Sequence, residues 1–392
     1  MSGGGGGGGL WKGMLGGGVA ACGVAYYLER AHLGPGVLAI GLLALGGLAV
    51  VFGSCEAMIM CVEGLGERLK WNQFVAGTMA GLASNVPEII MIGFVVAAEP
   101  RVAFVVTCLT LHVNALVFGI YSGLLPKDKT GHATLPDAIV KLGADLLACA
   151  AGLFLALGTL MLTLKVFDAG DHRGEGLGVP DLYVIGAGLL VVQVVSVREM
   201  LKRYAAADPS EKPADSSPTA AKAAVPSIAA IVGYGVLGMG GSFIGGHAVG
   251  DFADELVKAL TARHYSEMVG AIVVSLFSGV ASYLMIASAH MKGKTAIALS
   301  NVSGAVTQMP FVVFPATLII MAILAQTHVI PKLPNGGVLA IDMETTSVLL
   351  FAFPTLLLLW KSITDDGKVN KLETTVMVVL FGLIIYFLAQ HG

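Results

Sequence analysis

The sequence predicts an all-α protein that spans a membrane many times, built as two inverted five-helix repeats that follow an extra N-terminal helix. Three observations lead to this prediction. The chain is 56% hydrophobic and only 12% charged, whereas soluble domains carry about 25% charged residues. Apolar runs of roughly the 20 residues that a helix needs to cross a bilayer recur along the chain. A segment with a carboxylate embedded in apolar residues also has a counterpart in the second half.

The first 34 residues form a region of their own. Residues 1–9 are mostly glycine, and such a composition predicts disorder. The apolar run from Met14 to Leu28 fits either an extra helix or the core of a signal peptide. We favour an uncleaved helix, because no clear cleavage site follows before Glu29.

Ten further spans are expected, five on each side of a polar segment. That segment, residues 204–224, is rich in Ala, Pro, Ser, Asp and Lys, which predicts a linker that cannot build a core. It separates a first repeat, residues 35–203, from a second, residues 225–392. The expected spans are 35–63, 72–98, 102–124, 137–166, 180–200, 225–256, 266–289, 295–326, 342–361 and 371–389.

The distribution of basic residues predicts the orientation. Sixteen of the 23 Lys and Arg residues lie at the N-terminus, in the loops after the odd-numbered spans, or at the span ends next to those loops. Basic residues gather on the cytoplasmic side of a membrane protein. We therefore expect a multi-pass protein of the cell (inner) membrane, with the N-terminus and the linker in the cytoplasm and the C-terminus outside.

The repeat is visible in two segments that each contain eleven residues. LASNVPEIIMI, Leu82 to Ile92, and LFSGVASYLMI, Leu276 to Ile286, start 194 positions apart and share five residues. Five spans separate the two segments, and five is an odd number, so the second half must be inverted relative to the first. Inverted repeats let helices move around a fixed site near the middle of the membrane.

The first copy carries the strongest candidate site. Glu88 is an ionisable residue in an apolar span, and such residues are usually functional because they are costly in hydrocarbon. Ser84 and Glu88 are four apart and so share a helix face, with Asn85 close by. Their oxygens, and the carbonyl that Pro87 frees, suit hard cations. The alternative is a structural polar contact between helices.

The second copy offers neutral oxygens at the matched positions. Ser278 corresponds to Ser84, and Ser282 corresponds to Glu88. Gly279 is expected to loosen this helix where Pro87 does so in the first copy. The next span adds Asn301, so the second half supplies candidate ligands and no carboxylate at the matched position.

Two further embedded groups are candidates for proton coupling. His112 lies in the third span, and its ordinary pKa of about 6.5 suits a proton carrier. A hydrogen bond within the bundle is an equally good interpretation. Glu56 lies deep in the first span and is a second candidate, although a carboxylate there could also be structural.

These segments resemble motifs of the cation/calcium antiporter superfamily, which includes sodium/calcium exchangers. Residues 83–88, Ala-Ser-Asn-Val-Pro-Glu, stand where the family has Gly-Thr-Ser-x-Pro-Glu. Residues 292–308 are similar to the stretch that ends in Gly-Asn-x-x-Gly-Ser-Asn, with Asn301 and Gly304 matching. The resemblance implies a ten-helix core in which Glu88 is the principal metal-ion ligand, assisted by Ser84 and Asn301. The chain departs from the pattern at Ser282, where the family has a second acidic residue.

The expected function is secondary antiport of an inorganic cation, calcium or another, in exchange for sodium or protons. The alternative is a cation-binding or sensor protein on an exchanger scaffold that does not transport. A channel fits poorly, because no ring of like charges is visible. The sequence carries no phosphate-binding loop or zinc-hydrolase motif, so we expect a transporter rather than an enzyme, with no cofactor. The net charge of −3 gives no reason to expect nucleic acid as a partner; the expected partners are inorganic cations and the lipid bilayer.

Overall fold

A computed structural model describes most of the chain. The described residues are 9–32, 36–71, 73–125, 129, 133–135, 139–167, 176–204, 226–265, 267–291, 295–334, 336–364 and 368–391. The glycine-rich residues 1–8 and all of the expected linker except Tyr204 lie outside these ranges. The predictions of a disordered N-terminus and a cytoplasmic linker therefore stay predictions.

The described chain is mostly helical, with four two-residue strands and short connecting segments. The first repeat contains α2 (Gly36–Leu69), α3 (Gln73–Ala98), α4 (Pro100–Leu124), β1 (Ala133–Thr134), the π-helical turn η1 (Ile139–Gly143), α5 (Ala144–Val166), β2 (Gly176–Leu177) and α6 (Val179–Tyr204). The second contains α7 (Ile228–Thr261), α8 (Glu267–Ser278), α9 (Val280–Met291), α10 (Thr295–Gln308), η3 (Met309–Val313), α11 (Phe314–Gln326), β3 (Leu339–Ala340), α12 (Met343–Thr364), β4 (Lys368–Val369) and α13 (Lys371–His391). The extra helix α1 (Leu10–Arg30) precedes both.

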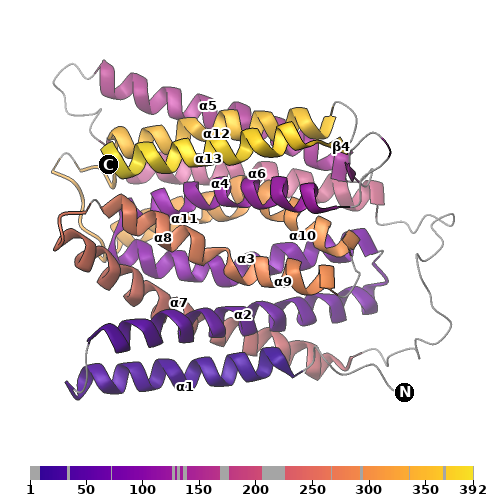
Figure 1. The fold of residues 1–392 in the computed structure, drawn as a ribbon, viewed down its shortest axis with the longest axis horizontal. Coiled ribbons are helices and arrows are strands. Elements are labelled where there is room, and N and C mark those ends of the chain that lie inside the picture. The colour runs from indigo at the N-terminus through magenta and orange to yellow at the C-terminus, as the bar shows by residue number, and fades with distance from the viewer. Residues whose placement is uncertain are drawn as a thin grey trace.

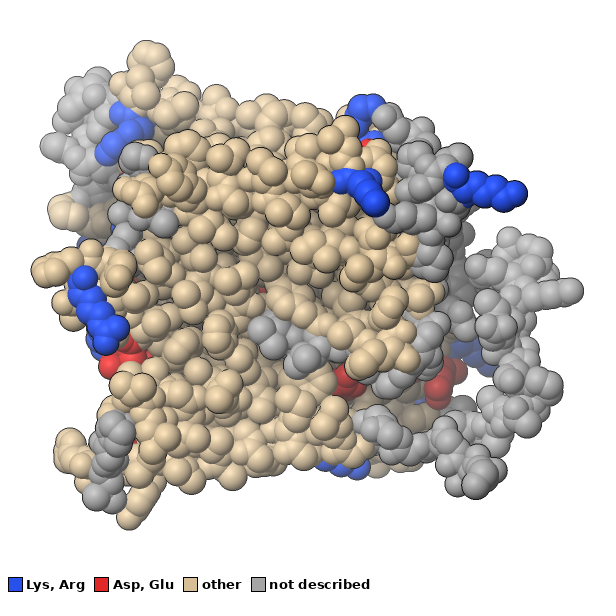
Figure 2. All heavy atoms as spheres, in the orientation of Figure 1, with Lys and Arg blue, Asp and Glu red and all other residues tan. Residues whose placement is uncertain are grey.

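The helices have the length and surface of membrane spans. Eight of the described helices are long and apolar enough to cross a bilayer. The predicted seventh span is divided into α8 and α9, of 12 residues each. Large apolar side chains point outward, as on α6, where Val184 is 73% exposed and Val194 67% exposed. Figure 2 shows most Lys and Arg toward the two ends of the visible face, with a broad band of other residues between them. A multi-pass membrane protein has this pattern.

The helices run roughly along the long axis and stack in layers (Figure 1). Helices α1, α2 and α7 form one side of the molecule, and α5, α12 and α13 form the other. Helices α3, α4 and α8 to α11 lie between them. Helix α1 begins at one end of the long axis and α13 finishes at the other, as an odd number of crossings requires.

Contacts between the repeats follow the inverted symmetry. The first helices of the two repeats, α2 and α7, form the most extensive helix pair. They approach closely because both carry small residues: a Cβ at Gly245 would come within 3.0 Å of the carbonyl oxygen of Gly47. Strand β1 pairs with β4, and β2 pairs with β3, both antiparallel. Each strand therefore pairs with one from the other repeat, and exchanging the repeats converts one pair into the other.

The matched helices α3 and α8/α9 differ in continuity. Pro87 lies inside α3, which continues through it without a break. In the second repeat α8 ends at Ser278 and α9 starts at Val280, so the helix is interrupted at Gly279. The expectation that Gly279 loosens this helix is confirmed. The proline, by contrast, is accommodated within a continuous helix.

Helix α1 is fastened to the first helix of each repeat. It packs along α2. Near its end the Tyr26 hydroxyl donates a hydrogen bond to Asp251 on α7, with an O–O distance of 2.8 Å. His247, one turn earlier on α7, lies 3.0 Å from the same carboxylate oxygen and stacks on Phe94 of α3 with ring centroids 5.1 Å apart. The extra helix is thus part of the bundle.

An ion-pair cluster joins the start of α4 to the start of α12. The Arg101 guanidinium lies 2.6 Å from Asp342 and 2.8 Å from Glu344. The backbone N–H of Thr345 donates to Asp342 at 2.8 Å. Burial opposes ionisation of the Asp342 carboxyl, but the Thr345 N–H and the Arg101 charge outweigh it and hold the pKa of that carboxyl below its ordinary value.

We predict that Arg101→Gln lowers the stability of the detergent-solubilised protein by on the order of 2 kcal/mol at pH 7, a fall of a few degrees in Tm. Because the folded-state pKa of Asp342 is lowered, its carboxylate stabilises the fold above the unfolded-state pKa of about 3.9. That contribution is lost as the pH falls through the lower folded-state pKa. The Tm difference from wild type should therefore shrink below about pH 4.

Thermal unfolding measured from about pH 2 to pH 7 checks this prediction, because the loss is expected below the unfolded-state pKa. Arg263→Gln, at an exposed arginine after α7, is the control and should leave Tm unchanged. A Tm difference for Arg101→Gln that does not vary with pH would contradict the role given to Asp342.

Candidate functional site

A buried amide pair joins the first repeat to the second in the middle layer. Asn85 on α3 donates to Gln308 at the end of α10, with an N–O distance of 2.8 Å. Both side chains are buried, at 7% and 4% exposure. The Gln308 amide nitrogen in turn donates to the Thr78 carbonyl on α3 at 3.4 Å. A buried amide needs such partners, so this pair fixes how α3 lies against α10.

The same crossing carries a second set of polar contacts, centred on α4. The hydroxyls of Thr110 on α4 and Ser278 at the end of α8 lie 2.9 Å apart. Asn114, one turn further along α4, donates to the Ala305 carbonyl of α10 at 3.4 Å. Asn114 and Gln308 are 194 positions apart, the offset of the repeat. Of these two equivalent residues, Asn114 joins α4 to α10 and Gln308 joins α10 to α3.

Glu88 lies one turn from this amide pair, at the junction of α3 with α2 and α9. Its Oε1 atom is fully buried and has no hydrogen-bond partner among the residues that the structure describes. It lies within electrostatic range of Cys55 on α2 and of Tyr283 on α9. A buried carboxylate oxygen without a partner is costly, and a bound cation or proton would compensate for it.

The other predicted ligands lie on the helices of the middle layer and have different contacts. The Ser84 hydroxyl donates to the Gly81 carbonyl at 2.7 Å, and the Ser84 carbonyl faces the Cys55 thiol at 3.8 Å. Ser278 donates to the Ser275 carbonyl at 2.9 Å, in addition to its contact with Thr110. Ser282 on α9 and Asn301 on α10 are both half-buried. The candidates thus come from four helices of the middle layer, α3, α8, α9 and α10.

The two candidates for proton coupling lie on different sides of the bundle. His112 is buried between α4 and α12, where its ring nitrogens lie 3.0 Å from the Thr355 hydroxyl and 3.3 Å from the Val348 carbonyl. It therefore makes hydrogen bonds within the bundle, on the side of α4 that faces α12. Glu56 is half-buried on α2, adjacent in sequence to Cys55 and so near the Glu88 junction.

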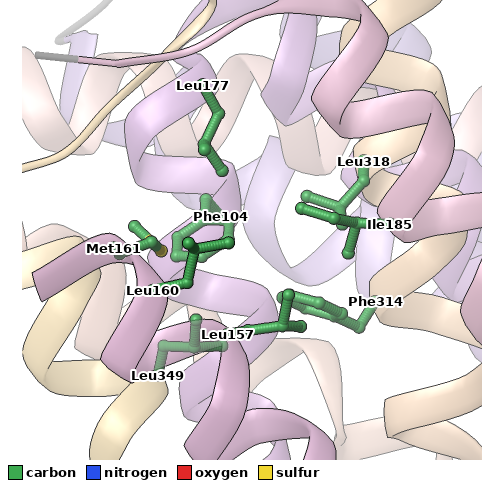
Figure 3. Close-up of a pocket in the computed structure, with 9 residues that line it drawn as sticks. All are labelled: Phe104, Leu157, Leu160, Met161, Leu177, Ile185, Phe314, Leu318 and Leu349. Atoms are coloured by element: carbon green, nitrogen blue, oxygen red, sulfur yellow. The ribbon is translucent and has the colours of Figure 1, made fainter. Parts of the chain in front are cut away.

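The composition of the site limits its chemistry. Among the described residues, no group of three or more His, Cys, Asp and Glu side chains lies together as a metal site would require. Glu88 is therefore not part of a multi-carboxylate cluster among the described residues, and such a site suits a cation that needs few negative charges. Figure 3 shows a separate pocket that is lined only by apolar side chains and offers an ion nothing; its lining is Phe104, Leu157, Leu160, Met161, Leu177, Ile185, Phe314, Leu318 and Leu349.

Sequence reasoning did not select Tyr283. Its hydroxyl is buried near Glu88, but it follows Ser282, the position that matches Glu88 in the repeat. The repeat pairs Glu88 with Ser282, so a comparison of the two copies selects Ser282 and not Tyr283. The signal that could have found Tyr283 was a tyrosine four residues after the helix-breaking Gly279 in an otherwise apolar segment.

Solved exchangers share this fold. The H+/Ca2+ exchanger CAX matches with a TM-score of 0.66 at 12% identity, over 97% of this chain and 91% of that one. The sodium-calcium exchanger NCX_Mj matches with a TM-score of 0.52 at 14% identity, over 87% of this chain and 95% of that one. No curated protein matches the sequence. At these identities the comparison shows that the chain shares the fold of these proteins.

A comparison with sequence families matches part of the second repeat. Residues 230–390 match the sequence model of the family described as sodium/calcium exchanger protein. This match covers less than half of the chain, and it agrees with the resemblance that the motifs indicated.

We predict that Asn85 and Gln308 are energetically coupled. Asn85→Ala and Gln308→Ala each leave a buried polar partner unsatisfied and should each cost about 1–3 kcal/mol. The double variant should lose less than the sum, by about 0.6 kcal/mol or more, as hydrogen bonds between membrane helices do.

Unfolding of the four proteins by increasing detergent denaturant measures this coupling. Pairing Asn85→Ala with Thr364→Ala, at the exposed end of α12, supplies the control, for which simple additivity is expected. Additive losses for the Asn85 and Gln308 pair would show that the observed hydrogen bond does not join the repeats energetically.

Proposed function

We propose that this protein exchanges an inorganic cation, calcium or another, for sodium or protons across the membrane, with Glu88 as the principal ion ligand. The observation that carries the proposal is the buried, unpartnered Oε1 of Glu88 at a junction of three helices. It lies in a fold shared with exchangers whose own names specify sodium, calcium and protons. Ser84, Asn85, Ser278, Ser282 and Asn301 are the proposed assisting ligands.

Exchange follows from one site that two ions share in turn. A carboxylate in a low-dielectric bundle is stabilised by a bound cation or by protonation, and the two compete for it. The inverted repeats give the site two related arrangements, open to either side. If the protein rarely switches between the two arrangements while Glu88 is charged and has no ion bound, each switch carries an ion across the membrane. This condition couples the flux of the cation to the flux of the counter-ion.

The number of carboxylates bears on which ion is carried. A dehydrated divalent cation that faces one carboxylate keeps a net positive charge, which is costly where the dielectric constant is low. A monovalent cation or a proton neutralises Glu88 completely. Glu56 is the proposed carboxylate that would compensate a divalent ion, and it shares with His112 the proposed role in proton coupling.

The membrane arrangement is proposed from the same features. The odd number of crossings supports termini on opposite sides of the cell (inner) membrane, and the distribution of basic residues supports an N-terminus in the cytoplasm and a C-terminus outside. The proposed units are residues 1–34, the repeats 35–203 and 225–392, and the cytoplasmic linker 204–224. The pairing of β1 with β4 and β2 with β3 supports this division, since each pair joins one strand from each unit.

We predict that Glu88→Gln abolishes gradient-driven exchange, lowering the initial rate at least 100-fold, because the neutral amide cannot be exchanged between a cation and a proton. The measurement is ion flux into proteoliposomes, with calcium, magnesium, sodium, potassium and protons compared as cargo and as counter-ion. Glu67→Gln, at an exposed residue near the end of α2, should transport as the wild type does.

Two results would contradict the proposal. Exchange that survives in Glu88→Gln would remove Glu88 from its role. Cation binding without exchange in the wild-type protein would favour the sensor alternative, for which Ser282 in place of a second carboxylate is the supporting observation.

We also predict that Ser282→Glu shifts selectivity toward divalent cations. A second carboxylate at the position matched to Glu88 allows a divalent ion to be neutralised in the site. The ratio of calcium to sodium half-saturation concentrations should fall about tenfold. Ser282→Gln, which has nearly the same size without the charge, is the matched control and should leave that ratio within twofold of wild type.

A further inference from the structure

The interruption of the second repeat places one side chain in an unusual position. Gly279 separates α8 from α9, and the backbone N–H of Tyr283 donates to its carbonyl oxygen at 3.0 Å. The ring of Tyr283 folds back over this glycine, so that a Cβ at position 279 would overlap the Tyr283 hydroxyl and ring. The absence of a side chain at Gly279 therefore determines where the Tyr283 hydroxyl lies.

That hydroxyl is buried and has no hydrogen-bond partner in the described part of the chain. Most buried polar side-chain atoms have a partner, and one without a partner calls for an explanation. Tyr283 needs one especially, because phenylalanine would fill the same space without that cost. The Glu88 Oε1 is unsatisfied in the same sense and lies in the same neighbourhood.

The two unsatisfied groups come from matched helices of opposite repeats. Glu88 is on α3, and Tyr283 is on α9, one residue beyond the position that corresponds to Glu88. They are within electrostatic range of each other without forming a direct hydrogen bond. A cation held between them would be coordinated by one carboxylate oxygen and one hydroxyl oxygen. Both buried atoms would then be satisfied together.

We propose that the Tyr283 hydroxyl is the ligand that the second repeat contributes to the ion at Glu88, and that it makes the site selective for a monovalent cation. This inference rests on the proposed function. A hydroxyl supplies an oxygen without adding charge, so the site with Glu88 keeps one negative charge, which one sodium ion or one proton neutralises. When the carboxyl is protonated, the same hydroxyl can accept its hydrogen bond.

The test uses Tyr283→Phe in the full-length protein. Sodium chloride is titrated against N-methyl-D-glucamine chloride at constant ionic strength and pH, and the half-saturation concentration for sodium is measured in proteoliposome exchange. We expect it to rise about tenfold while the maximal rate stays within twofold. Tyr386→Phe, at a tyrosine that is 57% exposed on α13, is the matched control and should change neither value.

A binding measurement separates this inference from the proposed function. Sodium should raise the Tm of the wild-type protein in detergent, and this increase should be at most half as large for Tyr283→Phe at the same sodium concentration. An unchanged half-saturation concentration, or an equal Tm increase in the two proteins, overturns the role of Tyr283 while exchange through Glu88 stands. Wild-type protein that binds sodium and does not exchange it refutes the proposed function, and the Tm comparison then still tests Tyr283.

A second variant moves the hydroxyl without removing it. Gly279→Ala should displace the Tyr283 ring and raise the half-saturation concentration for sodium by a similar factor. Gly233→Ala on α7, where an added Cβ meets no neighbouring atom within 4 Å, is the matched control and should leave it unchanged. In the Tyr283→Phe background, Gly279→Ala should add less than twofold. A full second tenfold rise would show that Gly279 acts independently of the hydroxyl, against the proposal.

Discussion

The arrangement of the middle layer depends on one constraint: a carboxylate buried in a membrane-spanning bundle must be neutralised. The described residues do not satisfy this constraint for Glu88, because its Oε1 is buried without a hydrogen-bond donor among them. Its burial would be a net cost to the fold unless a cation or a proton supplied the missing interaction. Under the proposed function, this cost is what makes ion binding favourable, and it links the stability of the fold to ion binding.

The two repeats share this task unequally. The first supplies the charge on a continuous helix that contains Pro87. The second supplies neutral groups around a break at Gly279. The symmetry survives in the packing, where α2 meets α7 and the strand pairs join the repeats at both ends. The packing is thus symmetric between the repeats, while the groups proposed to bind the ion are not.

Much of the fold could be predicted from the sequence, because hydrophobic runs and the parity of spans are local properties of the chain. The helix break at Gly279 was also predictable, since glycine in a repeat of a proline-containing segment indicates a weak point. The site could be predicted only in part. Glu88 was evident, as a carboxylate within an apolar span. The hydrogen bond between Asn85 and Gln308 and the proximity of Tyr283 to Glu88 depend on how helices far apart in the sequence pack together. The hydrophobic pattern of a single helix does not predict such packing.

The fastening of α1 has a consequence for the motions of the bundle. Tyr26 ties this helix to Asp251 on α7, and α1 also lies along α2. Any movement of the α2 and α7 pair against the remaining helices must therefore move α1 as well. The outer surface of α1 is therefore a place from which this movement could be slowed. Under the proposed function, a protein or an annular phospholipid bound to that surface would slow transport without contacting the ion.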